Sequence, residues 1–294
     1  MANEPIFGTL ALIGLGHIGS SVARAARKHG LVGQVVGHAR SARTRDTAMA
    51  LGFVDRVEAD PAAAVDGADC VMLCTPLSAY EDLARAFAPA LKPDAIVTDV
   101  GSVKGCVRQS LAPQLPAGVA LVPGHPIAGT EQSGPEAGFA ELFEGRWAIL
   151  TPDGAPNAAV DRVASLWRGM GSMVEIMSAE HHDKVLAITS HLPHLIAYTI
   201  VGTAADLEDH TRAEVIRFSA AGFRDFTRIA ASDPTMWRDV FLNNKEAVLE
   251  IIQRFNEDLT ALQRAIRWEE GDKLHELFTR TRAIRRGVVK AKQA

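Results

Sequence analysis

Short, continuous apolar runs alternate with helix-forming stretches over the first 178 residues. The runs are rich in β-branched residues and do not alternate with polar positions, which is typical of strands that are covered on both faces. The helical stretches between them favour crossover connections, so the pattern predicts a doubly wound α/β domain with a mainly parallel sheet over residues 1–178. The predicted strands are residues 10–13, 34–37, 70–75, 95–100, 120–122, 147–150 and 173–177.

The pattern changes after Ser178, where apolar positions recur at the spacing of a helix and no run favours a strand. Helices are predicted within 180–203, 212–218 and 234–267, so residues 179–294 are predicted to form an all-helical second domain. The apolar residues of the last helix cover more than one stripe, and we expect this domain to pack on two sides and form a homodimer. They are Val248, Leu249, Ile251, Ile252, Phe255, Leu259, Leu262 and Ile266.

Composition and charge narrow the classes of partner. The chain has 294 residues, of which 47% are hydrophobic and 22% charged, and its formal net charge is −4. This balance lacks the basic excess of a nucleic-acid-binding protein, so small molecules are the expected ligands. Cys70, Cys74 and Cys106 form no metal-ligand spacing and indicate free thiols in a reducing compartment.

No targeting or membrane segment is expected. The N-terminus has no basic region ahead of an apolar run, and no apolar stretch approaches the ~18 residues that a membrane span needs. We therefore expect a cytoplasmic protein that contacts no membrane.

A glycine-rich turn follows the first predicted strand and opens a helix-forming stretch. Its sequence, Gly-Leu-Gly-His-Ile-Gly over residues 14–19, fits the GxGxxG pattern. In this pattern the first glycine permits a tight turn, the second lets a pyrophosphate approach, and the third lets helix and strand pack closely. The turn predicts a Rossmann-type dinucleotide site. We assign to it Gly14, Gly16, His17, Ile18 and Gly19, together with Thr75 at the end of the third predicted strand.

The end of the second predicted strand favours NADP as the cofactor, with NAD as the alternative. NAD-binding proteins of this type usually carry an acid roughly 20 residues past the glycine turn. Here no acidic residue lies between Glu4 and Asp46. Arg40, Ser41 and Arg43 stand there instead and offer hydrogen-bond donors to a 2′-phosphate. A plain interpretation, surface arginines on the following helix, stays open.

Two polar segments follow later strands, at the edge where open α/β sheets bind ligands. Residues 98–105 form a strand-to-helix turn that presents the Ser102 hydroxyl. Residues 124–134 are rich in glycine and contain His125, a candidate for acid/base chemistry near neutral pH. On the residues alone, a purely structural His125 is equally consistent.

The predicted helical domain contains two further constellations. His191 and His194 are three residues apart, which raises the question of a metal site. There is no HExxH pattern and Pro193 disturbs the helix between them, so we expect no metal. Asp225 and Arg228 are also three residues apart; they either form a local ion pair or bind a substrate carboxylate.

These strings, in this order, resemble the prephenate/arogenate (cyclohexadienyl) dehydrogenases of tyrosine biosynthesis. The resemblance runs from the first strand to about residue 250. It rests on residues 14–19, Asp-Val-Gly-Ser-Val-Lys at 99–104, His-Pro-Ile-Ala-Gly-Thr-Glu at 125–131, Ser-His-Leu-Pro-His at 190–194, Gly-Phe-Arg-Asp-Phe-Thr-Arg at 222–228, and the strings at 232–234 and 236–238.

The resemblance implies an NAD(P)-dependent oxidative decarboxylation and a dimer formed through the helical domain. It implies that His125 takes the proton of the substrate hydroxyl and that Ser102 orients this histidine and the nicotinamide. It also implies a substrate pocket with a carboxylate-binding arginine. The residues that it assigns to this pocket are Ser190, His194 and Arg228, with Thr130 and Glu131 at the entrance.

Some points go beyond the resemblance or compete with it. Asp225 is a candidate to attract the ammonium group that arogenate carries and prephenate lacks. From the length we expect no fused chorismate mutase or ACT domain. One rival, a β-hydroxyacid dehydrogenase, needs a catalytic lysine at a glycine-rich helix start, whereas Lys184 has no glycine beside it. Another rival is a non-catalytic dinucleotide sensor, which has no need for His125, His194 and Arg228 to converge.

Overall fold

The computed structural model describes residues 4–206, 214, 217 and 221–290. The chain divides into two compact units, Met1–Lys245 and Glu246–Ala294. The helix predicted over 212–218 lies outside the described residues, apart from the single positions 214 and 217.

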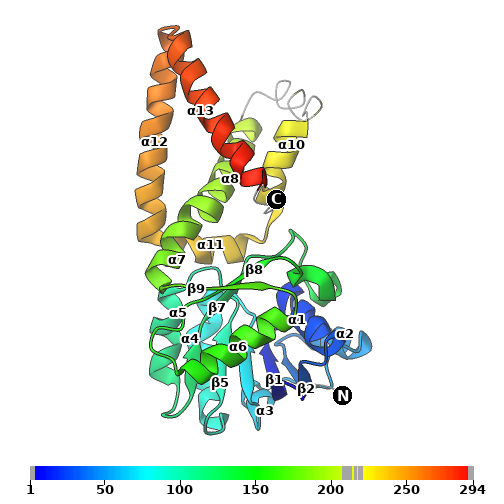
Figure 1. Ribbon diagram of the computed structural model, residues 1–294. Helices are drawn as coiled ribbons and strands as arrows, with labels where there is room; N and C mark the ends of the chain where they lie inside the picture. Colours follow the sequence, from blue (N-terminus) through cyan, green and yellow to red (C-terminus); the bar gives the residue numbers. More distant parts are fainter. Residues whose placement is uncertain (1–3, 207–213, 215–216, 218–220, 291–294) are drawn as a thin grey trace. The chain divides into compact units, whose positions relative to one another are not determined.

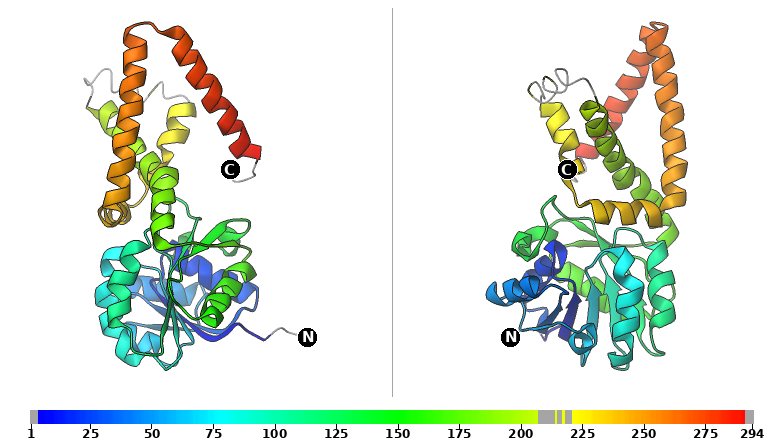
Figure 2. Two further views of the ribbon diagram at one scale, coloured as in Figure 1. Left: turned by 60° about the vertical axis from the view of Figure 1, so that its left-hand side comes forward. Right: turned by 180° about the vertical axis from the view of Figure 1, so that it is seen from behind.

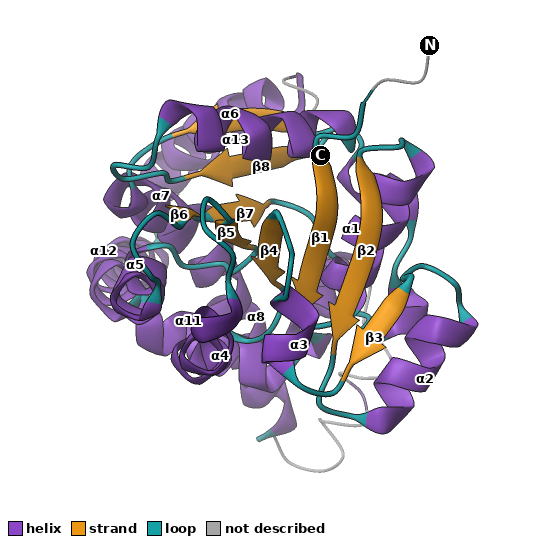
Figure 3. Cartoon of the chain, turned by 90° about the horizontal axis from the view of Figure 1, so that it is seen from below, coloured by secondary structure: helices purple, strands orange, loops and turns teal. Residues whose placement is uncertain are grey.

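A sheet of six parallel strands forms the centre of the first unit (Figures 1 and 3). Its order is β3-β2-β1-β4-β5-β6, so the winding direction reverses between β1 and β4, and this confirms the predicted doubly wound sheet. The sequence missed β3 because its three residues, Arg-Val-Glu, form no apolar run. The strands are β1 (Phe7–Ile13), β2 (Val32–His38), β3 (Arg56–Glu58), β4 (Cys70–Leu73), β5 (Ile96–Asp99) and β6 (Ala120–Val122).

A second, three-stranded sheet corrects one part of the sequence prediction. The runs at 147–150 and 173–177 do form strands, but these lie outside the parallel sheet, as β8 (Trp147–Leu150) and β9 (Met173–Ile176). β8 is the central strand of this sheet: β9 pairs with it in parallel, and β7 (Gly124–Pro126) pairs with it antiparallel. From the sequence we interpreted residues 124–126 as loop, because Gly-His-Pro has no strand propensity of its own.

Helices cover both faces of the main sheet. Alternate residues of β1 point to opposite sides, so Leu10 and Leu12 belong to one apolar cluster while Ala11 and Ile13 belong to the other. The first cluster contains residues of α1 and α6, and the second contains residues of α3, α4 and α5. These helices are α1 (His17–Lys28), α2 (Ala42–Ala50), α3 (Pro61–Val65), α4 (Tyr80–Phe87), α5 (Gly105–Leu111) and α6 (Asn157–Gly169).

The described residues after Ser178 form helices and turns without a strand, as predicted. Ser178 accepts a hydrogen bond from the N–H of His181 and so caps the first of these helices. The predicted run 234–267 breaks at Asn244 into two helices, and the second of them is the long orange helix in Figure 2. The helices are α7 (Ala179–Leu186), α8 (Leu192–Ala205), α10 (Ala221–Thr227), α11 (Pro234–Asn243), α12 (Lys245–Arg267) and α13 (Gly271–Lys290).

A five-residue π-helical segment, Ala187–His191, connects α7 to α8. It comes just before Pro193, which has no N–H to donate and whose ring crowds the preceding turn, and such wide turns accommodate that disturbance. The continuous helical run Ala179–Ala205 is long and apolar enough to cross a membrane, by length and composition only, contrary to the sequence expectation. Core helices of soluble proteins also have this length and composition.

A fully buried ion pair joins the two sheets. The ammonium of Lys104 lies 2.6 Å from Asp99 Oδ2 and 2.6 Å from the carbonyl oxygen of Gly124. Tyr80 donates its hydroxyl to the same carboxylate at 3.0 Å, and the N–H of Gly124 donates to its other oxygen at 3.2 Å. Because Asp99 ends β5 and Gly124 begins β7, these bonds fix the second sheet against the first.

Replacing Lys104 by methionine is expected to cost about 3–5 kcal/mol of unfolding free energy, because Asp99 becomes an uncompensated buried charge. Urea unfolding at pH 7 measures the change. The matched control is Lys92→Met, since Lys92 pairs with Asp69 where both side chains are partly exposed; it is expected to cost less than about 1 kcal/mol. Equally small losses in both variants would show that the buried pair does not hold the sheets together.

Candidate active site

The glycine turn has the shape that a dinucleotide pyrophosphate requires. Gly14 has φ +110°, and a Cβ there would lie 2.6 Å from the Cys74 carbonyl oxygen. A Cβ on Gly19 would lie 2.1 Å from the Gly14 oxygen, so helix and strand meet closely. A Cβ on Gly16 would meet no described atom within 4 Å, and no described side chain caps α1 at this residue. The first N–H groups of α1 are therefore open to a phosphate.

Two buried polar atoms near this turn have no hydrogen-bond partner among the described residues, His17 Nε2 and Thr75 Oγ1. His17 Nδ1 lies 3.1 Å from the Gln132 carbonyl oxygen and 3.3 Å from Thr130 Oγ1, which ties the loop after β7 to the start of α1. Ile18 is half-buried against the core. Orphaned polar atoms at an open helix N-terminus fit a bound dinucleotide, which would supply their partners.

The segment after β2 presents its predicted residues to solvent. Arg40 and Arg43 are exposed, and Ser41 accepts a hydrogen bond from the N–H of Thr44 and so caps α2. Arg45, which the sequence analysis did not single out, donates to the carbonyl oxygens of Ala39 and Arg40 at 2.7 and 2.8 Å. Arg45 therefore fixes the backbone that carries Arg40.

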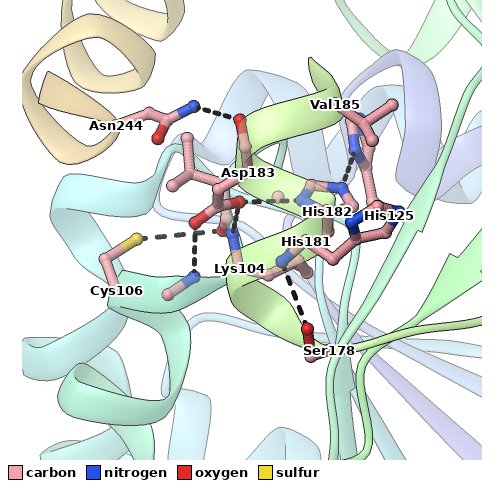
Figure 4. A network of polar contacts seen from close by, with 12 residues as sticks. Lys104, Cys106, His125, Ser178, His181, His182, Asp183, Val185 and Asn244 are labelled. Atoms are coloured by element: carbon pink, nitrogen blue, oxygen red, sulfur yellow. Dashed lines mark hydrogen bonds and ion pairs between the residues drawn. The ribbon is translucent and has the colours of Figure 1, made fainter. Parts of the chain in front are cut away.

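His125 lies in β7 and contacts a second buried histidine. Its Nδ1 lies 2.9 Å from Nε2 of His182, and Nδ1 of His182 lies 2.7 Å from Oδ1 of Asp183 (Figure 4). Burial, together with the charges of His182 and Lys104, holds the pKa of His125 well below 6.5. His125 is therefore neutral at pH 7.

Asp183 is anchored on several sides. Its Oδ1 and Oδ2 accept the backbone N–H groups of Lys104 and Gly105, each at 2.8 Å, and Asn244 donates to its carbonyl oxygen at 2.9 Å. Burial acts to raise the pKa of Asp183, but the hydrogen bonds from His182 and from these two backbone groups hold it below its ordinary value. Ser102 lies in the same β5–α5 turn and is half-buried.

Ser190, His191 and His194 take different partners around the π-helical segment. His194 Nδ1 lies 2.9 Å from the Ser190 carbonyl oxygen, and its ring stacks on Trp237 with the centroids 3.6 Å apart. His191 is fully buried, lies 3.1 Å from the side-chain amide of Asn244, and has a pKa that burial lowers to about 4. No group of three or more His, Cys, Asp and Glu side chains suited to a metal occurs in the part of the chain that the structure describes.

Arg228 pairs with Glu131, a residue 97 positions away. Its Nη1 donates to Glu131 Oε2 at 2.9 Å, so the segment after α10 meets the loop after β7. Burial and the charge of Arg228 both act to lower the pKa of His194. Asp225 is exposed in α10, and within the described ranges no ion pair joins it to Arg228.

The structure brings together His125, His182, Asp183 and the β5–α5 turn that carries Ser102, and it connects Thr130 to the glycine turn. His182, Asp183 and Lys104 were not singled out as site residues from the sequence. A His-Asp pair in the first turn of the helix that leads into residues 190–194 was the available signal. The contacts that connect His182 and Asp183 to His125 and to the β5–α5 turn span 57–79 positions, so spacing alone does not identify them.

Comparison with known proteins gives matches over nearly the whole chain. A family model described as "Prephenate dehydrogenase, nucleotide-binding domain" matches residues 22–176, and one described as "Prephenate dehydrogenase, dimerization domain" matches residues 178–280. A cyclohexadienyl dehydrogenase of Zymomonas mobilis is 46% identical over 281 residues, which are 95% of this chain and 96% of that protein.

Two solved structures are also similar. A prephenate dehydrogenase from A. aeolicus, in complex with hydroxyphenyl propionate and NAD+, has a TM-score of 0.89 at 35% identity and covers 96% of this chain and 98% of its own. An arogenate dehydrogenase from Synechocystis has a TM-score of 0.79 at 26% identity, with coverage of 94% and 98%. With both family models matched across the two parts of the sequence, the chain belongs to the prephenate dehydrogenase family.

Proposed function

We propose that this protein catalyses the NAD(P)+-dependent oxidative decarboxylation of prephenate, arogenate or both, with His125 as the base. The observation that carries the proposal is the neutral, buried His125, which is held by His182 and followed by a loop tied to the glycine turn. A neutral imidazole at this place accepts a proton at physiological pH. Family membership supports the reaction class.

The reaction needs a base, a hydride acceptor and anchors for charge. Bound NAD(P)+ supplies the hydride acceptor at the glycine turn. His125 takes the proton of the ring hydroxyl, which assists departure of hydride from the same carbon. The ring carboxylate then leaves as CO₂, its bonding electrons enter the ring, and the ring oxygen regains a proton to give the phenol. The products are 4-hydroxyphenylpyruvate from prephenate and tyrosine from arogenate.

The remaining site residues bind and orient the substrate. Ser102, in the turn next to the histidine cluster, orients His125 and the nicotinamide. Arg228 binds the side-chain carboxylate that both substrates carry, and in doing so exchanges its ion pair with Glu131 for one with substrate. Ser190 and His194 line the pocket, while Thr130 and Glu131 form its entrance.

The homodimer and its location are part of the same proposal. Several large apolar side chains of α12, α13 and the turn between them are more than half exposed in the single chain: Leu249 (57%), Leu259 (51%), Ile266 (64%), Trp268 (55%) and Phe278 (55%). Such surfaces mark protein contacts, and the matched dimerization-domain model supports a second copy as the partner. We place the enzyme in the cytoplasm, with a dinucleotide-binding domain over 1–178 and a substrate and dimerisation domain over 179–294.

The direct test is the reduction of NAD+ and NADP+ with prephenate and with arogenate, in all four combinations. Turnover in at least one combination is expected. A folded, dimeric protein that reduces neither cofactor with either substrate would contradict the proposal and favour a non-catalytic dinucleotide sensor.

The variant His125→Asn is expected to lose turnover by roughly 10²–10⁴-fold, because general base catalysis is worth about that much. The effect belongs in kcat, with KM little changed. In the wild type, kcat/KM should stay level as pH falls through 6.5 and drop only in more acidic solution, because the pKa of His125 lies well below 6.5. Circular dichroism controls for folding. Unchanged turnover in the variant would remove His125 from the mechanism.

We further propose that Arg40 favours NADP+ over NAD+. Removing it in Arg40→Ala should weaken binding of NADP+ by about 1.5–3 kcal/mol and leave NAD+ nearly unaffected, because only NADP+ carries the 2′-phosphate. Equilibrium binding of both cofactors measures this. Arg85→Ala, at an exposed arginine that pairs with Glu81 in α4, is the control. Equal losses for the two cofactors would mean that Arg40 merely faces solvent.

Asp225 is proposed to favour arogenate, whose ammonium it attracts, over the keto acid prephenate. Asp225→Asn is then expected to shift the ratio of kcat/KM values toward prephenate, whereas Arg228→Ala raises KM for both substrates. An unaltered ratio in Asp225→Asn would exclude Asp225 from selectivity and leave the assignment of Arg228 standing.

A further inference from the structure

A chain of buried hydrogen bonds leads from the start of α5 to His125. It consists of Asp183, His182 and His125, with contacts of 2.7 and 2.9 Å between successive side chains. The rings of His125 and His182 meet edge to face, and Figure 4 shows His182 between His125 and Asp183. The positions of the protons in this chain follow from what each group is able to donate.

The charge of Asp183 determines where the proton between Asp183 and His182 lies. The lowered pKa keeps its carboxylate ionised, and an ionised carboxylate only accepts hydrogen bonds. Its Oδ1 accepts the N–H of Lys104 as well as the contact from His182. The proton between Asp183 and His182 therefore belongs to Nδ1 of His182.

The tautomer of His182 determines the tautomer of His125. Burial lowers the pKa of His182, so the ring is neutral and its single proton is already on Nδ1. Nε2 of His182 is then an acceptor, and Nδ1 of His125, 2.9 Å away, must be the donor. Since His125 is also neutral, its Nε2 carries a lone pair.

We infer that His182 and Asp183 are positioning residues that hold His125 in the tautomer whose Nε2 is free to accept the substrate proton. The effect of this tautomer on turnover rests on the proposed function, whereas the tautomer itself is a property of the protein without substrate. The opposite tautomer would turn the lone pair of His182 Nδ1 toward the Asp183 carboxylate, which is repulsive. A histidine with its orienting carboxylate removed or neutralised loses turnover in other enzymes through the wrong tautomer.

The same chain acts when His125 becomes protonated. The titratable groups that act on His125 are Lys104 at the start of α5, His182 on α7 and His191 on the π-helical segment, and a positive charge on any of them opposes one on His125. A proton taken up at Nε2 leaves the Nδ1–H of His125 donating to His182, whose own Nδ1–H donates to the negative Asp183. The carboxylate thus stabilises the imidazolium through an intervening ring.

The primary test is nuclear magnetic resonance of protein labelled with 15N-histidine, at pH 7 and without substrate. Long-range proton–nitrogen spectra distinguish protonated from bare ring nitrogens, and the His125 signals are identified by their loss in His125→Asn. The expected result is a proton on Nδ1 and a bare Nε2 for His125. A proton on Nε2, or on both nitrogens, would overturn the inference, whatever the activity of the protein.

Three variants test the role in turnover. His182→Leu removes the acceptor and should lower kcat with little change in KM, while His182→Gln, whose amide oxygen accepts from His125 Nδ1, should keep most of the turnover that leucine loses. In Asp183→Asn the side-chain amide is able to donate to Nδ1 of His182, which reverses the direction of donation in both hydrogen bonds. His125 should then carry its proton on Nε2, and kcat should fall by roughly 10²–10⁴-fold.

The matched control is His181→Leu, at the exposed neighbour of His182 on α7, whose backbone N–H binds Ser178. It should leave kcat and the His125 tautomer unchanged. Full turnover in His182→Leu, or equal losses in His182→Leu and His182→Gln with both variants folded, would reduce His182 to a packing residue. Absence of turnover in the wild type with the expected tautomer would instead count against the proposed function alone.

Discussion

The arrangement of the site depends on the buried ammonium of Lys104. Its charge is balanced by Asp99 at the end of the main sheet, and its second contact is the carbonyl of Gly124, one residue before His125. The backbone N–H of the same lysine holds Asp183, which orients His182. One residue thus positions both sides of the His125–His182 contact. A rigid scaffold of this kind is what a base needs when its environment also works against its charged form.

Much of the fold and part of the site could be predicted from local sequence. The run before Gly14 is apolar on both faces, and a strand buried on both sides belongs to a parallel sheet. The glycine turn has the predicted geometry because the close approach of Gly19 to the Gly14 carbonyl admits no side chain. The helical character after Ser178 followed equally well from periodicity and from the cap at this serine.

The rest depended on contacts between distant residues. β3 and β7 have three residues each and are strands only because longer neighbours pair with them. No spacing rule connects His125 to His182 or Arg228 to Glu131. Asp225 and Arg228 are three residues apart and suit a local ion pair, but Arg228 pairs with the distant Glu131. The sequence indicated candidate residues for the site, and the structure supplied the contacts between them.

Neutron diffraction from deuterium-exchanged crystals, grown near pH 7, tests the central claim most directly, because it locates the protons of the Asp183–His182–His125 chain. The account predicts deuterium on Nδ1 of His182 and on Nδ1 of His125, with Nε2 of His125 bare. Deuterium on Nε2 of His125 would contradict it, because a base that already carries its proton there cannot accept the one from the substrate.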